Sequence, residues 1–291
     1  MTNLQIIILS ALQGFTEFLP VSSSGHLILL SKLTSFPDQG LEIDIAVHVG
    51  SILAVMIYFA RDIYDMACGL TADLFKRFPK LQNLFIRIST PRLKDFILKQ
   101  LPAYNPKLFW MLVVGTVPAV VFGLALHHFG MDWLRSTKII GWNILLFGIL
   151  LWIADHYSPA VRKIDDMTFK DAFLIGLAQC LAMIPGTSRS GITITTGRFL
   201  KLERREAAKF CMLLSVPAIA GAGLLVGWEI YQSGDYSNLH YVLSGIGYSF
   251  VASVAAIFIM MKWLKNYTFL PFVLYRIALG VLLLLHAYGH I

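Results

Sequence analysis

The sequence predicts an all-α polytopic membrane protein with six transmembrane helices and two re-entrant helix hairpins, arranged as an inverted repeat. The composition is the first reason, because 57% of the 291 residues are hydrophobic and only 14% are charged. An ordinary soluble domain is about 45–50% apolar and about 25% charged. The second reason is that two long apolar stretches are each interrupted by Pro, Gly and Ser. The third is that Lys and Arg gather between apolar segments, where they set membrane orientation.

Six segments are long and apolar enough to cross a membrane, since a transmembrane helix needs about 17–25 mostly apolar residues. They are residues 43–60, 108–126, 139–154, 210–230, 241–261 and 269–287. The third segment is the shortest of the six. We expect a single membrane domain over residues 1–291, with repeat halves of about 1–155 and 165–291. A basic insertion at about 61–107 interrupts the first half, and we expect it to be partly helical on the membrane surface.

Residues 3–31 and 171–199 are also apolar, but each stretch is broken in the middle by Pro, Gly and Ser, at 19–25 and 184–191. Proline removes a backbone donor and ends a helix. Irregular backbone at membrane depth is tolerated only inside protein or beside a water-filled cavity. We therefore expect each stretch to form a re-entrant helix hairpin.

The basic loops predict the orientation of the chain. Segment 61–107 alone carries nine Lys and Arg residues, so the positive-inside rule places it in the cytoplasm. The segments expected inside are 61–107, 155–170, 198–209 and the region of Lys262 and Lys265. The segments expected outside are 127–138 and 231–240. The first hairpin then enters and leaves from the outside, and the second from the inside.

The two hairpins also echo each other in sequence. Gln13 and Gly25 match Gln179 and Gly191 at an offset of 166. Similar halves of opposite orientation are typical of an inverted repeat, whose functional site lies near the midplane where the two broken helices meet. The side chains of the two breaks are therefore the candidates for a functional site.

Glu17 lies in a strongly apolar run, and an intramembrane carboxylate indicates function by default because it is costly. The alternative is a neutral, hydrogen-bonded structural Glu. Gln13, one turn earlier, shares a helix face with Glu17. Beside a phosphate group, Glu17 has two candidate roles. It can hold a divalent cation, Mg²⁺ or Ca²⁺, that bridges the phosphates, or it can act as a general base.

The first break places Ser22, Ser23, Ser24 and His26 just before the next helical stretch. Backbone N–H groups at a helix N-terminus attract anions, and a Ser hydroxyl near a His can become an activated nucleophile. The alternative is an ordinary Ser N-cap with a core His. We interpret these residues as functional because they share a hairpin with Glu17.

The second break contributes the polar side chains of Thr187, Ser188, Arg189, Ser190 and Thr193. Arg189 is the only charged residue between Asp171 and Arg198. An Arg at membrane depth needs an anionic partner, and its planar fork suits phosphate oxygens bidentately. An ion pair with Glu17 is a second interpretation, and it is compatible with the first.

Other polar residues carry weaker signals. His48 lies in an apolar span, where a hydrogen-bonded core histidine is the expected interpretation. Cys68, Cys180 and Cys211 are odd in number and far apart, which favours packing over a disulfide or metal site. The net charge of +7 is explained by topology, so we do not expect nucleic-acid binding.

Residues 13–26 (QGFTEFLPVSSSGH) and 185–193 (PGTSRSGIT) are the most specific patterns in the chain. The first looks like a Glu/Gln-x-x-x-Glu motif running into a Ser/His segment. The second is similar to Pro-Gly-x-Ser-Arg-Ser-x-x-Thr. Together, in this order and context, they resemble the motifs of the bacitracin-resistance type of undecaprenyl-diphosphatase, and the resemblance extends over essentially the whole chain.

This resemblance implies dephosphorylation of undecaprenyl diphosphate to the monophosphate lipid carrier of cell-wall synthesis. It also implies a divalent cation and a site open to the outer face of the bacterial cytoplasmic membrane. The residues expected to be catalytic are Glu17, Ser23, His26 and Arg189, with Glu17 also a metal ligand. Those expected to bind substrate are Gln13, Ser22, Ser24, Thr187, Ser188, Ser190 and Thr193. As Gln, residue 13 cannot be a second anionic metal ligand.

We expect Ser23 or a water molecule to attack the terminal phosphorus, with His26 as the proton carrier. A second lipid-phosphatase superfamily is rejected, because it requires a His six residues after Arg189, where Thr195 stands. A lipid or small-anion transporter stays open, since inverted repeats with broken helices are equally transporter architecture. The expected partners are the lipid substrate and membrane lipids, and a homodimer is left open.

Overall fold

The computed structural model of the protein describes residues 2–33, 40–127, 136–233 and 239–290. In these ranges the chain is helical, with one isolated bridge between Arg162 and Leu202 and no strand. The main helices are α1 (Asn3–Phe18), α2 (Ser23–Leu33), α3 (Gly40–Tyr58), α7 (Lys107–His127), α8 (Thr137–Tyr157), α9 (Phe169–Gln179), α10 (Arg189–Phe199), α11 (Arg204–Ser233), α12 (Leu239–Trp263) and α13 (Leu270–Ala287).

Helices α7, α8, α12 and α13 are each long and apolar enough to cross a membrane, and α3 makes a fifth if it is counted with the bent helix that follows. Four of the six predicted segments lie within one helix of the structure, whereas 43–60 runs two residues past the end of α3 and 269–287 begins one residue before α13. The third predicted segment, 139–154, was too short, because α8 has 21 residues. The protein is therefore an all-α, multi-pass membrane protein.

Both predicted breaks are present. Helix α1 ends at Phe18 and α2 begins at Ser23, whereas α9 is followed by a short 3₁₀ turn and α10 begins at Arg189. The breaks share one local geometry, since Ser22 and Ser188 both have left-handed φ angles, of 75° and 72°. Each also accepts a hydrogen bond from the N–H three residues later, at 3.3 Å for Ser22 and 3.0 Å for Ser188.

Close packing of α1 against α12 fixes the helix that carries the first break. A Cβ atom on Gly14 would lie 2.5 Å from the Ser249 carbonyl oxygen, so only glycine allows this approach. Ser253 donates to the Gly14 carbonyl at 3.1 Å, and its Oγ lies 3.0 Å from the Ser51 hydroxyl, which adds α3 to the contact. Buried hydroxyls paired in this way hold helices together in the absence of water.

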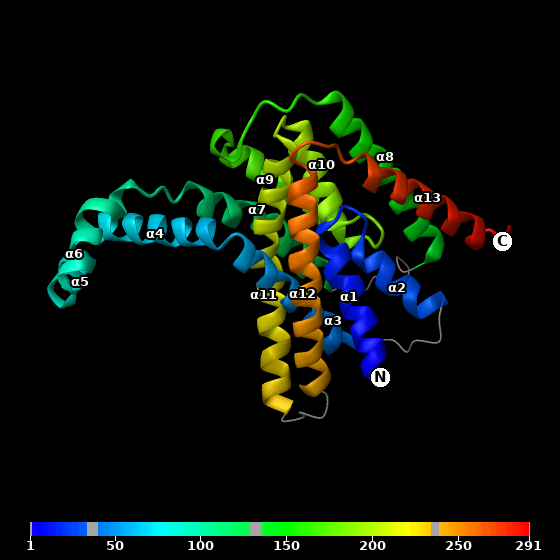
Figure 1. The fold of residues 1–291 in the computed structure, drawn as a ribbon, viewed down its shortest axis with the longest axis horizontal. Coiled ribbons are helices and arrows are strands. Elements are labelled where there is room, and N and C mark those ends of the chain that lie inside the picture. The colour runs from blue at the N-terminus through cyan, green and yellow to red at the C-terminus, as the bar shows by residue number, and fades with distance from the viewer. Residues whose placement is uncertain (1, 34–39, 128–135, 234–238, 291) are drawn as a thin grey trace.

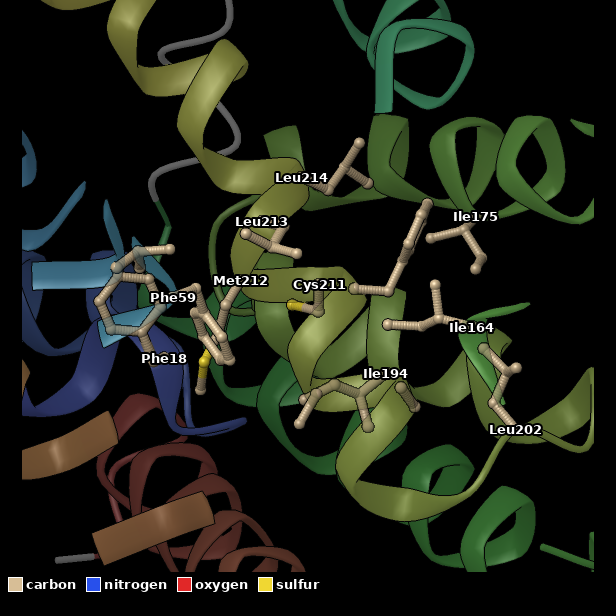
Figure 2. Close-up of a cluster of buried hydrophobic side chains, with 14 of the residues drawn as sticks. Phe18, Phe59, Ile164, Ile175, Ile194, Leu202, Cys211, Met212, Leu213 and Leu214 are labelled. Atoms are coloured by element: carbon tan, nitrogen blue, oxygen red, sulfur yellow. The ribbon is translucent and has the colours of Figure 1, made fainter. Parts of the chain in front are cut away.

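The largest apolar cluster lies directly beside the breaks. Phe18, at the end of α1, packs near Phe59 and Met212 at one side of this cluster, and Ile164 and Leu202 lie at the other (Figure 2). All of these side chains are at most 5% exposed. The cluster therefore fixes the end of α1 against α11.

The loops predicted to be internal contact one another in the structure. Ion pairs and hydrogen bonds join them through Lys209 and Asp62, Lys107 and Asp165, and Arg204 and Asp155. These contacts bring segments 61–107, 155–170 and 198–209 together at one end of the bundle. The predicted external segments 127–138 and 231–240 lie largely outside the described residues.

Residues 60–103 form a helical extension that we name the arm. It contains α4 (Ala60–Arg77), α5 (Pro79–Ile88), α6 (Pro91–Asp95), the π-helical turn Phe96–Gln100 and the 3₁₀ turn Leu101–Ala103. Helix α4 is bent by 79° from α3, and the arm projects sideways from the bundle (Figure 1). Its own small core includes Cys68, Phe75 and Ile97.

Candidate active site

Glu17 is the centre at which the two breaks meet. Its Oε2 accepts hydrogen bonds from Gln13 Nε2 and Ser23 Oγ, each at 2.7 Å. Its Oε1 accepts from Arg189 Nη2, also at 2.7 Å. Glu17 is 5% exposed, and all of these contacts come from donors. The site therefore holds Glu17 as a carboxylate, and the predicted ion pair with Arg189 is present.

His48 also belongs to this centre. Its Nε2 lies 3.5 Å from Glu17 Oε2, while its Nδ1 donates to the Asp44 carbonyl at 2.6 Å. The Nδ1 hydrogen bond agrees with the interpretation of His48 as a hydrogen-bonded histidine, but that interpretation did not include the contact with Glu17. The sequence did contain a signal for His48, because an imidazole in an apolar span indicates a functional site for the same reason as a carboxylate there.

The hydroxyls of the second break mainly hold the backbone in place. Ser190 Oγ donates to the Leu19 carbonyl at 2.9 Å, which ties the second break to the first. Ser188 caps α10, and its Oγ lies 3.2 Å from that of Ser190. Thr193 donates to the Arg189 carbonyl at 2.8 Å. These three residues thus position Arg189 and the start of α10.

His26 has partners other than those expected from the sequence. Its Nδ1 donates to the Ser22 carbonyl at 2.7 Å. Since that nitrogen carries the proton, Nε2 accepts from the Tyr275 hydroxyl at 2.5 Å in the neutral ring. Ser23 instead donates to Glu17. The structure therefore pairs Ser23 with the carboxylate rather than with the imidazole, and Ser24 is exposed.

Arg276 on α13 is a functional candidate that the sequence analysis missed. It is wholly buried, and its guanidinium donates to five carbonyl oxygens. These belong to Pro20 of the first break, Gly186 and Thr187 of the second, and Asn143 and Ile144 of α8. A Cβ atom on Gly191 would lie 2.6 Å from Arg276 Nη1, so glycine at this position leaves room for the guanidinium. Arg276 joins both breaks and thereby positions them.

Three buried polar atoms at the breaks have no hydrogen-bond partner within the described part of the chain. They are Arg189 Nη1, Thr187 Oγ1 and Gln13 Oε1. A buried polar atom without a partner costs about 1–3 kcal/mol, so such a group indicates a place where a ligand binds. Two of the three can donate, which suits an anion with several oxygens.

Comparison with known proteins decides the family. A family described as bacitracin resistance protein BacA matches residues 6–282. The chain belongs to this family. It is 41% identical to an undecaprenyl-diphosphatase of Erythrobacter litoralis, over 98% of this chain and 99% of the relative. It is 42% identical to that of Roseobacter denitrificans and 43% identical to that of Dinoroseobacter shibae, each over 99% of this chain and the full length of the relative.

The oxygen atoms at Glu17 fit the ligands of a hard divalent cation whose other ligands come from a substrate. Among the described residues, no group of three or more His, Cys, Asp and Glu side chains could form a metal site by itself. Mg²⁺ is commonly held by one or two carboxylates together with substrate phosphates and water. Glu17 supplies one carboxylate, and the unpartnered Gln13 Oε1 supplies a neutral oxygen one turn away.

Proposed function

We propose that this BacA-family protein hydrolyses undecaprenyl diphosphate to undecaprenyl phosphate and inorganic phosphate, which recycles the lipid carrier of cell-wall synthesis. The observation that carries this proposal is the state of Arg189. One of its terminal nitrogens is paired with Glu17, and the other is buried in the break without a partner among the described residues. A guanidinium with a free buried nitrogen suits a phosphate oxygen. The names of the relatives state the same activity.

The hydrogen bond between Ser23 and Glu17 supports Ser23 as the nucleophile and Glu17 as the base that takes its proton. In the covalent route, Ser23 Oγ forms a bond to the terminal phosphorus while the bond to the bridging oxygen breaks, and undecaprenyl phosphate leaves. The Ser23 proton passes to Glu17, 2.7 Å away. Water then hydrolyses the phosphoserine. In the direct route, Glu17 takes the proton from an attacking water instead.

Phosphoryl transfer depends mainly on positioning and on neutralising charge. Arg189 supplies positive charge at the first residue of α10, where backbone N–H groups also favour anions. Arg276 contributes indirectly, since it holds the carbonyls of both breaks and does not reach the surface. We assign Arg189 to the substrate phosphates and Arg276 to positioning.

A divalent cation, Mg²⁺ or Ca²⁺, is proposed at Glu17, with Gln13 Oε1 and substrate oxygens as further ligands. When bound, the cation would neutralise part of the diphosphate charge. The protein's own contribution is to hold Glu17 in place through Gln13, Ser23 and Arg189.

We further propose one membrane domain of six spans and two oppositely oriented hairpins, in a bacterial cytoplasmic membrane, with the site open to the outer side. The matched φ angles of Ser22 and Ser188 support two related halves. The contacts among the basic loops, such as Lys209 with Asp62, support a common internal side. The alternative of a transporter is not favoured, because the relatives are named for hydrolysis.

Phosphate release tests the proposed function directly. Purified protein in detergent is given undecaprenyl diphosphate and Mg²⁺, and inorganic phosphate is measured over time. We expect turnover that disappears in Glu17→Ala at equal concentrations of folded protein, checked by gel filtration. A protein that only moves lipid would release no phosphate in either form.

A further inference from the structure

We propose that the arm binds anionic phospholipids, with α5 lying on the membrane surface and its apolar side among the acyl chains. The arm is separate from the breaks, and its lipid contact is a second interaction beyond the hydrolytic site. The proposal depends on four observations: the charge of the arm, the apolar face of α5, the direction of that face and the way in which the arm is attached.

The arm carries eight basic and four acidic side chains, and its excess of positive charge is concentrated beyond residue 75. Between residues 76 and 99 there are seven basic side chains and one acidic side chain, Asp95. The basic residues are Lys76, Arg77, Lys80, Arg87, Arg92, Lys94 and Lys99. Only two of them form ion pairs within the described chain, Arg77 with Asp73 and Lys99 with Asp95. The remaining five are exposed and available to anionic headgroups.

Helix α5 has an uncovered apolar face. Leu81, Leu84, Phe85 and Ile88 follow one another at spacings of three, one and three residues, which places them on one side of a helix. All four are exposed, and the exposed fraction is 55% for Leu84 and 73% for Ile88. Such a face beside basic side chains is typical of helices that lie in a membrane interface.

The apolar face points away from the arm itself. Ile86 lies on the other side of α5 and packs against the small core of the arm with Phe75 and Ile97. Phe85 reaches the edge of that core, since its ring lies 5.6 Å from that of Phe75. Leu84 and Ile88 therefore face outward, where a partner outside the arm must cover them.

Both ends of the arm are attached to membrane helices. One residue separates the end of α3 from the arm, and three residues separate the arm from the start of α7. A bend of 79° turns α4 away from the axis of α3, so the arm leaves the bundle sideways (Figure 1). A helix that starts at the end of a span and runs nearly across its axis remains close to the bilayer surface.

The positive charge of the arm favours an anionic bilayer over a second copy of the arm as the partner that covers the apolar face of α5. A second copy of the arm would bring two strongly basic surfaces together, and like charges oppose such contacts. A bilayer containing anionic lipid satisfies both features, because acyl chains cover Leu84 and Ile88 while headgroups pair with Lys80 and Arg87. Each basic residue near such a surface strengthens binding about fivefold.

Spin labels on the full-length protein test this placement. Cysteine is introduced at Ile88 or, as the matched control on the opposite side of α5, at Asn83. The native Cys68, Cys180 and Cys211 are buried, and unsubstituted protein measures their background labelling. The protein is reconstituted in phosphatidylcholine with about 30 mol% phosphatidylglycerol or in phosphatidylcholine alone. Collision of each label with a neutral nickel chelate in water is then compared.

We expect the label at residue 88 to be at least about threefold less accessible to nickel than the label at residue 83 when phosphatidylglycerol is present. Replacing Lys80, Arg87 and Arg92 by Gln should reduce this ratio towards one, provided that gel filtration and helical content match the parent. Equal accessibility at both positions would show that the arm lies in water. Equal protection in phosphatidylcholine alone would overturn the role of anionic lipid. Protection that appears together with spin–spin broadening would assign the face to a second copy.

Discussion

Arg189 Nη2 and Glu17 Oε1 lie 2.7 Å apart, so an ion pair between residues 172 positions apart in the sequence joins the two helix breaks. Both side chains are largely buried. Breaking a buried pair by removing one partner costs about 3–5 kcal/mol, because the other charge stays buried. The pair therefore contributes to the structure of the site as well as to its chemistry, and experiments must separate the two roles.

Arg189→Lys separates the structural role from the chemical role, because it keeps the charge and removes the planar guanidinium. We expect kcat/KM to fall about 100-fold, which corresponds to about 2.7 kcal/mol. Lysine can pair with Glu17 or with a phosphate oxygen, but it cannot do both in the geometry of a guanidinium. The measurement is phosphate release with thermal stability recorded in parallel. Near-normal turnover would mean that Arg189 serves only as a structural cation.

Ser23→Ala tests the nucleophile. We expect turnover to fall at least about 1,000-fold, because Ser23 carries the only hydroxyl that donates to Glu17 among the described residues. Ser24→Ala is the matched comparison, since Ser24 is exposed, and it should lose far less. Mass spectrometry of acid-quenched turnover should find phosphate on Ser23. Substantial activity in Ser23→Ala without phosphoserine in the parent would assign the attack to water.

Gln13→Glu tests the cation. A second carboxylate one turn from Glu17 should lower the Mg²⁺ concentration required for half-maximal activity by about tenfold, since carboxylates are preferred ligands of this ion. Activity is measured against free Mg²⁺ after treatment with a chelator, with Gln13→Leu as the variant that should require more. An unchanged requirement in both variants would remove Gln13 from the cation site.

Arg276→Met tests the positioning role. Five carbonyl oxygens lose their donor, so we expect a loss of about 3–5 kcal/mol of stability and a fall of at least about 5 °C in Tm. Arg276→Lys should be intermediate, because an ammonium has three donors. Thermal unfolding in detergent gives the Tm values. If both variants unfold at the parent temperature, Arg276 does not hold the breaks together.

Cysteine accessibility tests the orientation of the chain. Lys80→Cys and His240→Cys both place a thiol at an exposed position, the first in the arm and the second at the start of α12. In intact cells, an impermeant thiol reagent should modify residue 240 and reach residue 80 only after the membrane is opened. Labelling of both from one side would refute the proposed topology.

The sequence predicted the breaks and their central residues because the signals are local. Proline, glycine and serine interrupt a helix wherever they cluster, and lone charges such as Glu17 and Arg189 stand out in an apolar run. Arg276 carries the same signal, since it is the only Lys, Arg, Asp or Glu after Lys265. It was overlooked because no motif surrounds it.

Other features of the site depend on tertiary structure and could not be predicted. The left-handed φ of Ser22 is rare for residues other than glycine, and it decides which side chains after the break face Glu17. His26 consequently lies against Tyr275 rather than beside Ser23. His48 reaches Glu17 only because α3 packs against α1 and α12.

The position of Arg276 has a consequence for the order of biosynthesis. The carbonyl of Pro20 receives its hydrogen bond from a residue that the ribosome adds 256 positions later. Until α13 is in place, the nascent chain must keep the polar turns of both breaks without the guanidinium that ties them together. Insertion of α13 is therefore the step that completes the site. A ribosome that stalls before residue 276 leaves a chain that contains Glu17 and Arg189 but lacks Arg276, which joins the two breaks.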